Sequence, residues 1–83
     1  MTDELVNEAL ATIKRRRISK KALFILIQDL NLKGFSHVTP NNTVREILTA
    51  VFNASTIDEI HFFINILDDK SNDAYLSGII KKW

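Results

Sequence analysis

Residues 43–69 read TVREILTAVFNASTIDEIHFFINILDD, and this stretch decides the fold. It contains the pattern Thr-x-x-Glu twice, at residues 43–46 and 56–59. In such a capping box, the threonine side chain accepts a hydrogen bond from the third backbone N–H of a helix, and the glutamate accepts one from the threonine's own N–H. The sequence therefore predicts two consecutive helices, the first beginning after Thr43 and the second after Thr56.

Apolar residues recur at intervals of three or four positions in both segments. This spacing places them on one helical face, which is the face that packs into a core. In the first segment the apolar face holds Val44, Ile47, Leu48, Val51 and Phe52. In the second, which we expect to run to about Asp69, the predicted core residues are Ile57, Ile60, Phe63, Ile64 and Leu67.

Two more helices are expected before this stretch. A narrow apolar arc predicts a helix from residue 3 to about residue 15, capped by Thr2. Ser19 is expected to cap a second helix that ends at Lys33, with Gly34 as its left-handed stop.

A last short helix is expected over residues 73–82, and residues 35–42 form the one long loop. A chain of 83 residues is long enough for one small domain. The fold class is therefore all-α, a compact orthogonal bundle of about five short helices in a single domain over residues 1–83.

Composition excludes several classes of protein. Apolar residues make up 46% and charged residues 25%, which is typical of globular chains. No cysteine is present, which removes disulfides, cysteine-ligated zinc and thiol nucleophiles. The longest apolar run, residues 22–27, is far shorter than the ~20 residues that span a bilayer. The N-terminus is acidic and lacks a basic signal-peptide start, so we expect a cytoplasmic protein without membrane insertion.

The net charge of +1 conceals separated blocks of charge. The basic cluster consists of Lys14, Arg15, Arg16, Arg17, Lys20 and Lys21. It suits an anionic partner, either nucleic acid or an acidic protein surface, or else it is a solvated helix end. No aromatic residue interleaves the cluster, so bases would have no stacking platform there. We therefore rank a protein partner above nucleic acid.

The second capped helix carries an apolar pair outside its core arc. Phe62 and Ile66 lie one turn apart and are flanked by Asp58 and Asp69. An apolar pair within an acidic rim resembles the centre of a protein-binding interface. The alternative is that another helix of the same chain covers the pair.

Ile25 and Leu32, seven residues apart, widen the apolar surface of the helix that follows Ser19. A helix that is apolar on two sides is explained by a homodimer, or by a central helix surrounded by its own chain.

Nothing in the sequence indicates catalysis. His37 and His61 are far apart and have no carboxylates at metal-ligand spacing, and no phosphate-binding or nucleophile motif occurs. We expect no enzyme, metal or cofactor. The predicted function is a non-catalytic protein–protein interaction module, a small regulator or inhibitor; the alternative is a nucleic-acid-binding regulatory protein that uses the basic cluster.

Overall fold

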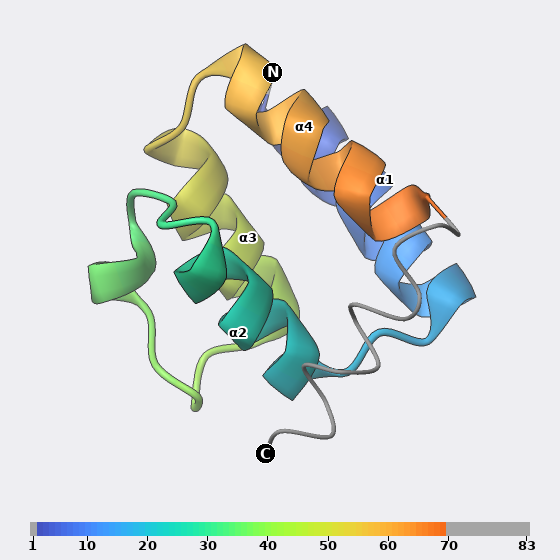
Figure 1. Cartoon of the computed structure of the whole chain (residues 1–83). Coiled ribbons are helices and arrows are strands. Elements are labelled where there is room, and N and C mark those ends of the chain that lie inside the picture. Colours follow the sequence, from blue (N-terminus) through green and yellow to red (C-terminus); the bar gives the residue numbers. More distant parts are fainter. Residues whose placement is uncertain (1, 70–83) are drawn as a thin grey trace.

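The computed structural model describes residues 2–69 of the chain (Figure 1). Within this range there is no strand, and the elements are α1 (Thr2–Arg16), α2 (Lys20–Asp29), the short 3-10 helix η1 (Phe35–His37), α3 (Val44–Asn53) and α4 (Ile57–Asp68). In Figure 1, α1 and α4 lie side by side, and α1 also packs against α3. The all-α class is confirmed. The helix expected over residues 73–82 lies outside the described residues.

The predicted helix starts at residues 43 and 56 are confirmed, because both capping boxes form. The Glu46 backbone N–H donates to Thr43 Oγ1 over 3.1 Å, and the Thr43 N–H donates to the Glu46 carboxylate over 2.8 Å. The box at residues 56–59 has the same two distances. Ser19 also caps α2 as expected, since its hydroxyl accepts from the Ala22 N–H.

The predicted end of α2 at Lys33 is wrong, because the helix ends at Asp29. The Asn31 N–H donates to the Gln28 carbonyl over 3.0 Å, and the Leu32 N–H donates to the Ile27 carbonyl over 3.2 Å. These two bonds form a Schellman motif around a left-handed residue, here Asn31 with φ 54°. Asparagine tolerates that conformation better than most residues, so the helix stops before it reaches Gly34.

Gly34 is required for a different reason, its close approach to α3. Its φ is 85°, and a Cβ at this position would lie 2.7 Å from the Ala50 carbonyl oxygen. This contact places η1 beside α3. On the other side, the Phe35 ring of η1 meets the Phe24 ring of α2 edge to face at a centroid distance of 5.0 Å. The chain itself therefore packs against the side of α2 that carries Phe24.

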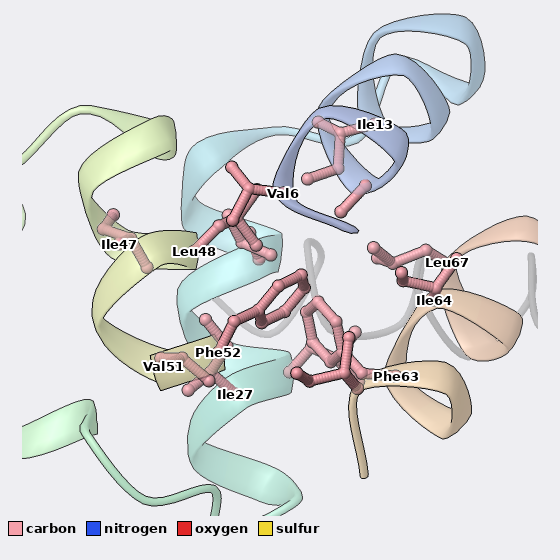
Figure 2. Packing of buried hydrophobic residues seen from close by; sticks show 14 of the residues in the cluster. Val6, Ile13, Ile27, Ile47, Leu48, Val51, Phe52, Phe63, Ile64 and Leu67 are labelled. Carbon is pink, nitrogen blue, oxygen red and sulfur yellow. The ribbon is translucent and has the colours of Figure 1, made fainter. Parts of the chain in front are cut away.

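One apolar core joins the four α-helices of the described residues (Figure 2). Phe52 of α3 and Phe63 of α4 lie at its centre, with ring centroids 5.8 Å apart and ring planes 82° apart. Other fully buried side chains around them are Val6, Leu23, Leu26, Ile27, Ile47, Leu48, Val51, Ile60 and Leu67.

Two details at helix starts differ from the expectation. Ile57, predicted as a core residue, is 47% exposed. Side chains tilt toward the N-terminus of a helix, so the first residue of α4 projects beyond the helix start. Thr2, predicted as a cap, is the first residue of α1, and its hydroxyl donates to the Asn53 side-chain oxygen at the end of α3.

Replacing Gly34 by Ala should lower the free energy of unfolding by about 2 kcal/mol or more. The left-handed backbone costs a residue with a Cβ about 1–2 kcal/mol, and the new methyl group would also clash with the backbone of α3. Urea denaturation followed by circular dichroism measures the change. Ser36→Ala, an exposed change in η1, should stay within about 0.5 kcal/mol of the parent; an equal loss for both variants would contradict the role given to Gly34.

The capping glutamates make stability depend on pH. The hydrogen bond from the Thr43 N–H lowers the pKa of Glu46, and that from the Thr56 N–H lowers the pKa of Glu59, both below the ordinary value of 4.5. A carboxyl group whose pKa falls on folding stabilises the fold above its unfolded pKa, and this contribution is lost as the pH drops through the lowered value. Stability should therefore fall below about pH 4.5.

The double variant Glu46→Gln, Glu59→Gln keeps acceptors for both caps but removes both titrations. Its urea midpoint should fall less steeply than the parent's between about pH 5 and pH 3. Glu8→Gln, at an exposed position of α1 that caps no helix, is the control. A double variant that retains the parent's full acid sensitivity would rule out the caps as its source.

Candidate functional site

The structure divides the basic cluster predicted from the sequence. Arg15 forms an ion pair with Asp68 of α4, and both side chains remain more than half exposed. Arg16 and Lys21 also interact with other groups of the chain. Lys20 lies near enough to Glu46 for its charge to contribute to the lowered pKa of that carboxyl group. The six cations therefore do not act as one uniform patch.

Two of the cations, Lys14 and Arg17, line an open groove of about 570 Å³ where the end of α1 meets the start of α3. The described residues that line this basic groove are Leu10, Ala11, Ile13, Lys14, Arg17, Ile18, Val44 and Arg45. They comprise three cations, five apolar residues and no carboxylate. Within residues 2–69, no ion pair engages Lys14, Arg17 or Arg45.

Local structure explains why these side chains meet. Leu10 and Lys14 lie four residues apart and therefore share one side of α1, and Arg17 follows directly after the end of this helix. Arg17 is held at φ 55° because α1 also ends in a Schellman motif. There the Arg17 N–H donates to the Lys14 carbonyl, and the Ile18 N–H donates to the Ile13 carbonyl over 3.0 Å.

Arg45, which no pattern in the sequence indicated, is the third cation of the groove. The cap at Thr43 fixes it in the first turn of α3, and that much could be deduced from the sequence. The packing of α3 against α1, which brings Arg45 to Lys14 and Arg17, is a tertiary property.

The outer face of α4 is partly as expected. Phe62 is 59% exposed, and Asp58 and Asp69 are exposed as well. Ile66, by contrast, is half-buried and packs against the core cluster. The structure therefore leaves Phe62, rather than a pair of apolar side chains, as the exposed group of this face.

Ile25 and Leu32 do not present the open apolar strip that a dimer through α2 would use. Ile25 is buried within its own chain, and Leu32 is half-buried against the core. Beside Ile25 lies a smaller cavity of about 390 Å³, lined mostly by α2 residues and Pro40. A homodimer through these residues stays a hypothesis, and the mass in solution at high protein concentration would test it.

His37 and His61 both lie on the surface. Among the residues that the structure describes, no three His, Asp or Glu side chains are grouped as metal ligands would be. None of the helices described is both long and apolar enough to cross a membrane. Comparisons with protein-family models, with curated proteins and with solved structures find no match for the chain. Its function therefore has to be inferred from its own surfaces.

Replacing Arg17 by Gly should raise the free energy of unfolding by about 0.5–1 kcal/mol. Glycine avoids the cost of about 1–2 kcal/mol that a Cβ incurs in the left-handed conformation, and its greater freedom in the unfolded chain offsets part of that gain. Urea denaturation measures the difference. Ala11→Gly, at a position inside α1, should instead lose about 1 kcal/mol. Destabilisation by Arg17→Gly would contradict the strain assigned to this position.

Proposed function

We propose that the chain is a non-catalytic protein-interaction module, a small regulator or inhibitor that docks another protein against the outer face of α4. The observation that carries this proposal is the exposure of Phe62, whose side chain is 59% accessible. Every other phenylalanine of the chain is buried or half-buried. Burying such a ring in a partner is worth about 1.5–3 kcal/mol, and exposed aromatic residues are frequent binding hot spots.

The surroundings of Phe62 support an interface with a polar rim. Asp58 lies one turn before it and Asp69 two turns after it, and both are exposed. Ile57, at the start of α4, is the other large apolar side chain with high exposure in the described part of the chain. A partner that covers this helix would bury apolar area at Phe62 and meet acidic groups at the edge, which favours a partner with basic residues around an apolar pocket.

Nucleic-acid binding through the basic cluster is less well supported. The Asp68 carboxylate lies against Arg15, and Asp69 follows it in the chain, so negative charge borders the cluster. Lys14 and Arg17 face a groove that is largely apolar, whereas a phosphate backbone offers charge and no apolar surface.

The test compares Phe62→Ser with His61→Ser, a change at the neighbouring exposed position of α4. Neither variant should change the free energy of unfolding by more than about 0.5 kcal/mol. Phe62→Ser should weaken binding to the natural partner by about 30-fold or more, as a hot-spot loss of about 2 kcal/mol implies. Quantitative affinity capture from the source cells, followed by titration of the captured partner, measures this.

A second arm addresses nucleic acid directly. Labelled duplex DNA, single-stranded DNA and RNA are titrated with the protein at about 50 and 200 mM salt, and anisotropy reports binding. We expect no micromolar binding at either salt concentration. Strongly salt-dependent binding that disappears when Arg15, Arg16 and Arg17 are changed to Glu, and that Phe62→Ser leaves intact, would overturn the proposal in favour of a nucleic-acid-binding protein.

A further inference from the structure

We infer that the basic groove between α1 and α3 is a second binding site, which receives an acidic amphipathic segment of a partner protein. The inference rests on the proposed function in one respect, that the chain is a protein-interaction module. It does not depend on Phe62, because Phe62 lies in α4 and the groove is formed by α1 and α3. Lys14 and Arg17 come from the end of α1 and Arg45 from the start of α3. The open groove has a volume of about 570 Å³.

The composition of the groove specifies the chemistry of its occupant. Three cations border it without a carboxylate among the described lining residues, so the site attracts negative charge. Leu10, Ile18 and Val44 are only half-buried, so covering them removes further apolar surface from water. A segment with apolar residues on one face and Asp or Glu beside them satisfies both demands, as amphipathic helices do in apolar grooves.

The chain's own C-terminal segment does not have this chemistry. Residues 70–83 contain three lysines and one aspartate, which gives them a net charge of +2. A cationic segment would be repelled by Lys14, Arg17 and Arg45. Charge complementarity therefore favours a segment from another protein.

The backbone of Arg17 is a second, independent observation that supports a binding site in the groove. The position that ends α1 requires a left-handed backbone, where glycine is the usual residue, yet the chain carries an arginine there. Strained backbone of this kind concentrates at functional positions. The side chain of Arg17 is one of the three cations that line the groove.

The experiment begins with display of random 12-residue peptides, selected on the full-length protein. Binding of the enriched peptides is then measured by fluorescence anisotropy with the parent and with two groove variants, Arg45→Glu and Arg17→Gly. Since Arg17→Gly is expected to stabilise the fold, weaker binding by this variant cannot be caused by unfolding. Lys33→Glu, an exposed cation outside the groove, is the matched control for net charge.

We expect enriched peptides that combine Asp or Glu with Leu, Ile or Phe. Their binding should fall about tenfold or more in Arg45→Glu, fall in Arg17→Gly, and stay unchanged in Lys33→Glu and Phe62→Ser. If Phe62→Ser still binds the peptides, then the peptides bind at the groove and not at the outer face of α4. Failure of the proposed function at Phe62 would therefore leave the groove result in place, and the reverse also holds.

Three results would overturn the inference. The first is a selection that yields no peptides, or peptides bound equally well by Arg45→Glu. The second is duplex DNA binding lost in the same groove variants, which would assign the cations to nucleic acid. The third is concentration-dependent dimerisation abolished by Arg45→Glu and by Phe62→Ser, which would identify the acidic α4 face of a second copy as the occupant.

Discussion

The contact between Phe52 and Phe63 is the interaction on which the rest of the structure depends. The two rings meet edge to face at the centre of the core and join α3 to α4, which only residues 54–56 separate in the chain. Aromatic pairs of this geometry add about 0.5–1.5 kcal/mol to the area that they bury. α1 packs directly against both helices, and its contact with α3 fixes its position there. That position in turn brings Arg45 to the end of α1 and creates the basic groove.

Helix starts could be predicted from the sequence because a cap is a local contact. The side chains of Thr43, Thr56 and Ser19 each accept a hydrogen bond from the backbone N–H three positions ahead. Four consecutive residues are therefore enough to predict where each helix begins. The end of α2 could not be predicted in the same way. The sequence predicts Gly34 as the residue that ends α2. Its glycine is instead required because the backbone of Gly34 lies against Ala50 of α3, a contact that only the folded structure shows.

In the candidate site, too, local features could be predicted from the sequence and tertiary contacts could not. Helical periodicity placed Phe62 outside the core arc, and its exposure agrees with that prediction. The sequence grouped Arg15 with Arg17, whereas the fold pairs Arg15 with Asp68 and turns Arg17 to the groove. The sequence shows only which cations are adjacent along the chain. The packing of α1 against α3 and α4 determines which of them lie on the same binding surface.

The paired capping boxes also bear on the order of folding. α3 and α4 carry their own start signals, follow each other after three residues, and meet through Phe52 and Phe63, which are close in sequence. Contacts of low sequence separation have a small loop-closure cost and form early. The contacts of α1 with α4, by contrast, close a loop of about 50 residues, as the separation of Arg15 from Asp68 illustrates. We therefore expect α3 and α4 to form and to meet at Phe52 and Phe63 early, while the more extensive contacts of α1 with both helices form in a later step.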